Sequence, residues 1–249
     1  MSLETFFSQE TNFDLAMKPF TWQHGVLVFL ALLTIVLTLK YAVHIKDSKH
    51  FNKIKIGFAI WVISLEIIYH IHYWIHGMFS IPMHLCSFGA FLSVYILLTD
   101  SKKAFQILFL IGITGGLMAL LIPDTLGYTY FNVRYYLFPI MHINIMMVPI
   151  FYYKAYGYRV DRKSIYLTSV LILALMPIAN IFNNLYDRNY LFIGQKPRIF
   201  GDFLPPYPYY LILGGIGAFL FFNILYYVQS LDSKTLKKKL SFKASKEVE

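Results

Sequence analysis

The residues of this chain that could do chemistry in an apolar setting are a single cysteine and eight histidines. A cysteine with a histidine base nearby can act as a nucleophile and carry an acyl group as a thioester. Two histidines four residues apart, such as His72 and His76, share a helix face and could hold zinc instead. Which chemistry is possible depends on the elements that bring these side chains together.

The composition indicates a membrane protein with several spans. The 249 residues are 57% hydrophobic and 14% charged, with a mean hydropathy of +0.55, which excludes a disordered chain and an ordinary soluble domain. The net charge of +9 could suggest nucleic acid, but the Lys and Arg residues stand in short clusters between apolar runs. We therefore interpret this charge as a signal of membrane topology and expect no nucleic-acid partner.

Long segments without charged residues predict the spans, because a bilayer core of about 30 Å needs around 20 apolar helical residues. The run from Ile56 to Thr99, apolar apart from Glu66, is too long for one helix and is divided at Ser80-Ile81-Pro82. The predicted fold class is an all-α bundle of seven transmembrane helices. Their expected ranges are 22–42, 53–76, 82–99, 104–122, 135–153, 164–183 and 208–229.

Basic residues give the expected orientation, since positively charged loops stay on the cytoplasmic side. With the N-terminus outside and the C-terminus cytoplasmic, 17 of the 22 Lys and Arg residues fall in cytoplasmic segments. We predict one membrane domain, residues 1–230, and a disordered basic cytoplasmic tail, residues 231–249. The first residues lack the pattern of a cleavable signal peptide, so the first helix is expected to act as the insertion signal.

This orientation gathers polar residues in the outer half of the bilayer. Six of the eight histidines, together with Cys86 and the mid-span carboxylate Glu66, are expected there. Ionisable groups inside a membrane are costly and tend to mark function, so their convergence favours a site. Glu66 and His70 share a helix face, where they are either a structural ion pair or a catalytic histidine with its orienting carboxylate.

Cys86 is the candidate nucleophile of this site. It follows Ser80 and Pro82, which are suited to the start of a helix. The positive end of a helix stabilises a thiolate, whereas burial in lipid opposes it, so a histidine base would decide the balance. His84 is about 200° from Cys86 around a regular helix, which makes His142 from another span the better base. His84 would then be an oxyanion donor, a substrate contact or a structural hydrogen-bond partner.

Six motifs stand in order along the chain between residues 15 and 230: Lys18-Pro-Phe with His24, Ile81-Pro-Met-His-Leu-Cys-Ser-Phe-Gly89, Gly115-Gly-Leu-Met-Ala-Leu-Leu-Ile-Pro-Asp124, Phe138-Pro-Ile-Met-His142, Asn184-Leu-Tyr-Asp-Arg-Asn-Tyr190 with Lys196-Pro197, and Pro206-Tyr-Pro-Tyr-Tyr210. Together they resemble the YwaF-like family of bacterial integral membrane proteins. That family is similar to the eukaryotic transmembrane protein 164, an acyltransferase that moves fatty acyl chains between phospholipids with a cysteine nucleophile. Ile81 and Met83 stand where the family more often has leucine.

The resemblance implies an acyltransferase, or a lipid hydrolase, that acts on phospholipid acyl chains through a cysteine thioester in the outer half of the bilayer. By this resemblance Cys86 would be the nucleophile and His142 the base. The positions of the residues add His84 as a third candidate catalytic residue. Membrane phospholipids are the expected partners, the bacterial cytoplasmic membrane is the expected location, and neither a cofactor nor a metal is expected. The residues expected to contact substrate are His24, Glu66, His70, Asp124, Asn189, Tyr190 and Lys196.

Two other classes of function stay open on the sequence. A zinc-dependent intramembrane lipid hydrolase would use His72 and His76 with a third histidine. A non-enzymatic transporter, receptor or haem-binding protein would use the polar outer cavity. Outer basic residues are expected at the depth of lipid phosphates, where they either bind head groups or simply extend to the interface. These residues are Arg134, Arg188, Lys196 and Arg198.

Overall fold

The computed structural model describes the backbone of residues 2–246 and the side chains of residues 2–231 apart from Ile199 and Asp202. This part of the chain is helical and contains no strand, which confirms the all-α class. The helices are α1 (Leu3–Phe6), α2 (Trp22–Lys46), α3 (Phe51–Trp74), α4 (Leu85–Thr99), α5 (Lys102–Leu121), α6 (Val133–Ala155), α7 (Arg162–Tyr186), η1 (Tyr190–Phe192), η2 (Arg198–Phe203) and α8 (Tyr209–Lys246).

Local sequence explains where several helices begin and end. Thr21, Ser101 and Asn132 precede α2, α5 and α6, and each side-chain oxygen accepts a hydrogen bond from a backbone N–H of the first turn. Asp100 and Asp187 follow α4 and α7 with left-handed backbone, at φ 54° and 49°. Aspartate tolerates this conformation better than most residues, so it stops a helix without strong strain.

The long helices are suited to cross a membrane, and α4 is the exception. Six qualify by length and composition, namely α2, α3, α5, α6, α7 and residues Tyr209–Leu231 of α8. Helix α4 is apolar but has 15 residues, about 22 Å of helix, which is shorter than a bilayer core of about 30 Å. Because α4 ends beside the start of α5, its first residue lies inside the bundle, below the ends of α3 and α6. The structure is therefore a multi-span helical membrane fold, and a count of seven spans stays a prediction.

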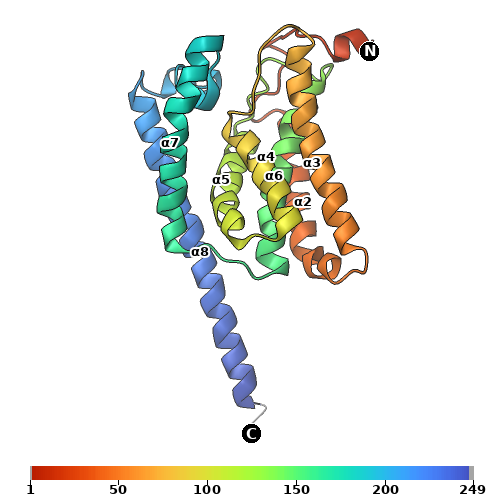
Figure 1. Cartoon of the computed structure of the whole chain (residues 1–249), viewed down its shortest axis with the longest axis vertical. Helices are drawn as coiled ribbons and strands as arrows, with labels where there is room; N and C mark the ends of the chain where they lie inside the picture. Colours follow the sequence, from red (N-terminus) through yellow and green to blue (C-terminus); the bar gives the residue numbers. More distant parts are fainter. Residues whose placement is uncertain (1, 247–249) are drawn as a thin grey trace.

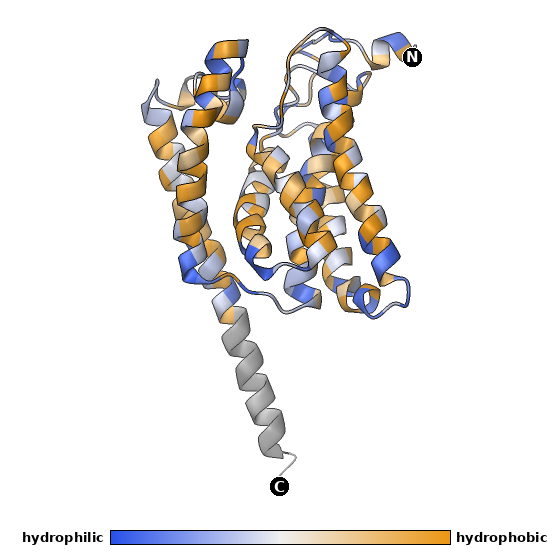
Figure 2. Ribbon diagram, viewed as in Figure 1, coloured by the Kyte–Doolittle hydropathy of each residue, from blue (hydrophilic) through white to orange (hydrophobic). Residues whose placement is uncertain are grey.

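Helices α2 to α6 form one group, and α7 and α8 pack as a pair beside it (Figure 1). Hydrophobic residues cover the helices along their length, whereas hydrophilic residues concentrate near helix ends and in the loops (Figure 2). Helix α5 is central, since it contacts α2, α4, α6, α7 and α8 and carries many of the fully buried residues. A lipid-facing surface around a buried central helix is the expected result for an apolar chain in a bilayer.

Two glycines bring α5 and α6 into close contact. A Cβ on Gly112 would lie 2.6 Å from the Ile145 carbonyl oxygen. A Cβ on Gly116 would overlap the side chain of Met146 and lie 3.1 Å from the His142 carbonyl oxygen. Glycines four residues apart share a helix face and let two helix backbones approach. This contact therefore determines the position of His142 relative to α5.

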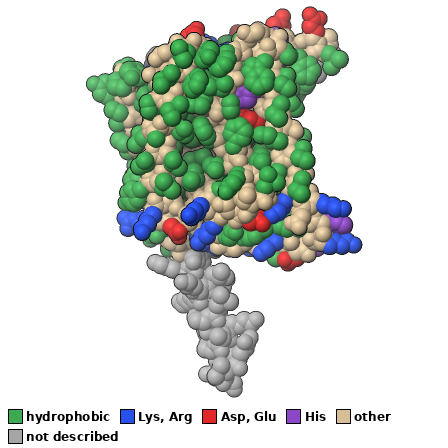
Figure 3. All heavy atoms as spheres, viewed as in Figure 1, with side chains coloured by type: hydrophobic (Ala, Val, Ile, Leu, Met, Phe, Trp, Pro, Cys, Tyr) green, Lys and Arg blue, Asp and Glu red, His purple; other side chains and the backbone are tan. Residues whose placement is uncertain are grey.

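The helices give the molecule two ends, which we call the Cys86 end and the Asp100 end. Lys and Arg side chains gather at the Asp100 end on the face drawn in Figure 3, and hydrophobic side chains cover most of the surface above them. Because positively charged loops stay on the cytoplasmic side, these residues predict that the Asp100 end is cytoplasmic. The Cys86 end comprises residues 2–21 and the loops 75–84, 122–132 and 187–208, and the Asp100 end comprises the loops 47–50, 100–101 and 156–161.

The backbone of α8 continues to Lys246 and so includes most of residues 231–249. From the sequence, residues 231–249 are predicted to form a disordered basic tail. Residues 247–249 lie outside the described part of the chain. The division into a membrane domain, residues 1–230, and a tail stays a prediction.

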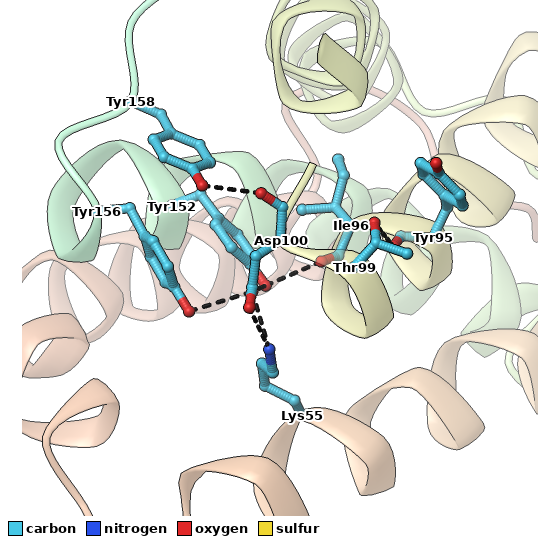
Figure 4. Close-up of polar contacts among 8 residues, drawn as sticks. All are labelled: Lys55, Tyr95, Ile96, Thr99, Asp100, Tyr152, Tyr156 and Tyr158. Atoms are coloured by element: carbon cyan, nitrogen blue, oxygen red, sulfur yellow. Dashed lines mark hydrogen bonds and ion pairs between the residues drawn. The ribbon is translucent and has the colours of Figure 1, made fainter. Parts of the chain in front are cut away.

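A polar network closes the Asp100 end (Figure 4). Lys55 Nζ donates to both carboxylate oxygens of Asp100 at 2.8 and 2.7 Å, and the hydroxyls of Tyr152 and Tyr156 donate to Oδ1 at 2.6 and 3.1 Å. The Tyr158 hydroxyl donates to the Asp100 carbonyl oxygen at 2.8 Å. Burial raises the pKa of Asp100, but the hydrogen bonds from Lys55 and the tyrosines outweigh it and hold the pKa below its usual value. The network ties α3 and α6 to the turn between α4 and α5.

Candidate functional site

Cys86 is the second residue of α4, and the segment before this helix forms part of its surroundings. The N-cap residue is His84, with extended backbone at φ −79° and ψ 152°, and its side chain makes no capping hydrogen bond. Because the helix begins at Leu85, Ser80 and Pro82 lie outside it, and the predicted start at residue 82 is wrong. The first-turn N–H groups next to the Cys86 thiol therefore receive no side-chain cap.

Glu66, His70 and Ser80 form a buried hydrogen-bonded chain beside this segment. His70 Nε2 lies 3.1 Å from Glu66 Oε1, and His70 Nδ1 lies 2.8 Å from Ser80 Oγ. The Trp74 indole N–H donates to the Ser80 carbonyl oxygen at 2.9 Å. The Ser80 hydroxyl is thus occupied by His70 and does not cap α4, which explains why the helix begins later than predicted. The chain also anchors the segment to α3.

Cys86 shares its apolar surroundings with the helix that carries His142. Cys86 is partly exposed and packs against a buried cluster that joins α3, α4 and α6. The cluster consists of Val62, Leu65, Ala90, Val133, Leu137, Met141 and Ile145.

His142 is arranged as a potential base. Its Nδ1–H donates to the Phe138 carbonyl oxygen at 2.7 Å, so a neutral ring keeps its lone pair on Nε2. Within the described residues, neither His142 nor His84 is hydrogen-bonded to Cys86. Among the described residues, the His142 Nε2 atom is therefore without a hydrogen-bond partner, whereas the Cys86 thiol is hydrogen-bonded to its neighbour Ser87.

His84 faces the loop that carries Tyr190. Its ring centroid lies 5.1 Å from that of Tyr190 and 6.0 Å from that of Phe192. The Tyr190 N–H donates to Asn183 Oδ1 at 2.6 Å, and the Tyr190 hydroxyl accepts a hydrogen bond from the Ile81 N–H at 3.0 Å. Tyr190 therefore connects the loop after α7 to the segment before α4. The Tyr190 ring packs beside the His84 ring.

Four other residues expected to contact substrate are hydrogen-bonded within the chain, where they organise the Cys86 end. Their part in substrate binding stays a prediction. The contacts are His24 Nε2 to the Leu120 carbonyl oxygen at 3.0 Å, Asp124 Oδ1 to the Leu126 N–H at 3.0 Å, Asn189 Oδ1 to the N–H groups of Gly194 and Gln195 at 3.1 Å, and Lys196 Nζ to the Leu204 carbonyl oxygen at 2.7 Å.

The N-terminal segment engages the His72 and His76 pair. His72 Nε2 lies 3.1 Å from the Ser8 carbonyl oxygen and its Nδ1 lies 3.0 Å from Gln9 Nε2, while His76 Nδ1 donates to the His72 carbonyl oxygen at 2.8 Å. Both ring nitrogens of His72 are thus occupied. Among the side chains that the structure describes in residues 2–231, no three of His, Cys, Asp or Glu are grouped to hold a metal. This donor set does not fit the zinc alternative.

Arg134 lies inside the protein rather than at the membrane interface. It is 4% exposed, its Nη1 donates to the Tyr69 carbonyl oxygen at 3.2 Å, and its Nη2 donates to the Tyr73 hydroxyl at 2.7 Å. Its Cζ lies 3.8 and 4.2 Å from the two ring centroids. The interpretation that the side chain simply extends to the membrane interface is therefore wrong for Arg134. The two tyrosines are four residues apart on α3, a spacing that could have indicated this pocket.

Comparison with protein families assigns most of the chain to one family. The model of the TMEM164 family matches residues 19–226, a range that contains every candidate site residue. No curated protein and no solved structure matches the chain significantly.

Proposed function

The chain belongs to the TMEM164 family, and we propose that it is an integral membrane acyltransferase, or lipid hydrolase, acting on phospholipid acyl chains through a thioester on Cys86. One observation carries the proposal. Cys86 lies in the first turn of α4 and packs against a buried cluster to which α6, the helix of His142, contributes residues on either side of His142. The membrane fold keeps this group beside lipid. Assignment to the YwaF-like group and to a bacterial cytoplasmic membrane belongs to the same proposal.

The start of α4 supports a role in acyl transfer. The positive end of a helix stabilises thiolate at Cys86. The N–H groups of Leu85 and Cys86 receive no side-chain cap from His84, so they are available to hydrogen-bond a ligand. Donors of this kind stabilise the oxyanion of a tetrahedral intermediate. The short helix thus presents a nucleophile and oxyanion donors at one place inside the bundle.

The proposed reaction has two halves. The Cys86 thiol gives its proton to His142 Nε2, and the sulfur forms a bond to the ester carbonyl carbon. The ester C–O bond then breaks, and the leaving hydroxyl takes the proton from His142, which leaves an acyl thioester on Cys86. A lysolipid hydroxyl, or water, attacks the thioester with His142 as base, and the proton returns to the Cys86 thiolate.

The hydrogen bonding of His142 supports its role as the base in both halves of this reaction. The hydrogen bond from His142 Nδ1 to Phe138 fixes the ring so that Nε2 faces away from its own backbone. Because Cys86 and His142 are not hydrogen-bonded without substrate, the reaction requires the thiol and Nε2 to approach when lipid binds, as is common at active sites.

The test is mass spectrometry of purified protein incubated with a phospholipid that carries an isotope-labelled acyl chain. We expect an adduct with the mass of that chain on the peptide containing Cys86, and we expect neutral hydroxylamine to remove it. Since the chain has a single cysteine, Cys86→Ala serves as the matched control and should show no adduct and no turnover. Full turnover by a folded Cys86→Ala protein would contradict the proposal.

A further inference from the structure

We propose that the Cys86 end holds a binding site for the phosphate group of a phospholipid, formed by Arg134 and Arg188 around the ring of Tyr73. The link between this site and acyl transfer rests on the proposed function, whereas phosphate binding itself does not require Cys86. Both arginines belong to segments of the Cys86 end, Arg134 in the first turn of α6 and Arg188 just after α7.

Arg134 is a buried cation without an acidic partner. In the described part of the chain, the ion pairs join Lys18 with Asp14, Lys55 with Asp100 and His70 with Glu66, and none includes Arg134. The rings of Tyr69 and Tyr73 stabilise the guanidinium through cation–π contact, but they do not neutralise its charge. An uncompensated buried charge is costly, so a structure that keeps one favours an anionic ligand.

Arg188 brings a second cation to the same ring. Its Cζ lies 5.4 Å from the Tyr73 ring centroid, compared with 4.2 Å for Arg134. Its Nε is buried and has no hydrogen-bond partner in the described residues, and no carboxylate pairs with the side chain there. The two guanidinium groups lie near the same tyrosine ring, and their like charges repel each other. An anion that contacts both would relieve this repulsion and provide an acceptor for Nε.

A phosphate ester fits this pair best. Arginine presents several N–H donors in a planar fork that matches phosphate oxygens, and such charge-assisted hydrogen bonds are strong. The ring of Tyr69 lies 3.8 Å from the Arg134 guanidinium, and Tyr69 packs against the same buried cluster as Cys86. A phospholipid with its phosphate on the arginines would therefore have its glycerol esters toward the cluster against which Cys86 packs.

The experiment uses Cys86→Ala protein purified in a neutral detergent, so that no lipid is consumed. Thermal unfolding is followed while a short-chain phosphatidylglycerol, a diacylglycerol with the same acyl chains, or inorganic phosphate is titrated. We expect the phospholipid to raise Tm saturably, because a ligand that binds only the folded state stabilises it. Arg188→Gln should weaken the apparent affinity about tenfold, the loss expected for a hydrogen bond to a charged group.

Arg198→Gln is the matched control. This exposed arginine of the Cys86 end lies over Phe13, 5.1 Å from the ring centroid, and does not contact Tyr73, so its loss should change the affinity by less than about twofold. Arg134→Gln should reproduce the effect of Arg188→Gln. Equal affinities in the Arg188→Gln and Arg198→Gln proteins would overturn the site.

Two other outcomes would also overturn the proposal. Equal stabilisation by diacylglycerol would show that the phosphate is not recognised. Arg188-dependent stabilisation by inorganic phosphate, with none by the phospholipid, would assign the pocket to free phosphate rather than lipid. Because Cys86 is absent from every sample, failure of the proposed acyl transfer would leave all these results unchanged, and the two proposals can fail separately.

Discussion

The two ends of the bundle differ in how far their polar groups are hydrogen-bonded. At the Asp100 end, Lys55 and two tyrosine hydroxyls donate to the Asp100 carboxylate, and a third tyrosine donates to its carbonyl oxygen. At the Cys86 end, within the described residues, His142 Nε2 and Arg188 Nε have no partner. Buried polar groups are almost always hydrogen-bonded in folded proteins, so groups left unpaired in one region need an explanation.

This difference separates a structural network from a candidate site. A fully satisfied polar network contributes rigidity and stability, and substrate has nothing left to bind there. An unpaired donor and an unpaired lone pair cost stability, but they are groups that an enzyme needs for a ligand. We therefore expect substitutions at the Asp100 end to change the free energy of unfolding, and those at the Cys86 end to change catalysis.

The largest expected effect is on catalysis, from His142→Gln. Loss of the base should reduce the rate of phospholipid acyl transfer by about 10²–10⁴-fold. The Tm should change little, because the only described hydrogen bond of the His142 side chain is to Phe138 in its own helix. The measurements are initial rates with labelled phospholipid and thermal unfolding by circular dichroism. His76→Gln, at an exposed histidine of the same end, should keep the normal rate. A normal rate for folded His142→Gln would exclude His142 as the base.

A large loss of stability is expected from Asp100→Ala. Removing the carboxylate leaves Lys55, whose side chain is 10% exposed, without its partner. The Asp100 side chain is 35% exposed, so the ion pair is only partly buried, but Lys55 and the hydroxyls of Tyr152 and Tyr156 all lose their acceptor. The total cost is about 3 kcal/mol, which corresponds to a fall in Tm of roughly 6–12 °C for a chain of this size. The measurement is thermal unfolding in detergent. Asp47→Ala is the control, since Asp47 is exposed, and it should change stability by less than about 0.5 kcal/mol. A similar Tm for both variants would show that the network is not stabilising.

A smaller effect is expected from Gly112→Ala, which acts on the contact that connects the two ends. The added Cβ would lie 2.6 Å from the Ile145 carbonyl oxygen, so α6 must move away from α5 at a cost of about 1–3 kcal/mol. The movement should also lower the acyl-transfer rate, because α6 carries His142. Gly115→Ala, with no atom within 4 Å of its Cβ, should retain activity and stability. Equal stabilities of the two variants would argue against close packing at Gly112.

The helical elements could be predicted because their signals are local. The six long helices each begin within a few residues of the predicted first residue. The length of an apolar run and the charges that flank it define a span. The start of α4 could not be predicted, because Ser80 looks like a helix cap in sequence. Its hydroxyl is taken by His70, and only the packing of α3 against this segment brings the two together.

The candidate site was only partly predictable for the same reason. The four-residue spacing of Glu66 and His70 correctly indicated a contact on one helix face. Nothing in the sequence placed Asp100 in a network, because a carboxylate between two spans looks like an ordinary loop residue. Likewise, Arg134 looked like an interfacial cation, and its burial between tyrosines depends on how α6 packs against α3.

The sequence by itself determined the class of this protein, because hydropathy and charge along a chain decide which segments can enter a bilayer and which cannot. The tertiary structure decided which polar groups meet. Contacts between helices depend on packing, such as the glycine contact between α5 and α6, and packing is not a property of any single segment. The same kinds of residue therefore became a closed network around Asp100 and an open, partly unpaired site around Cys86.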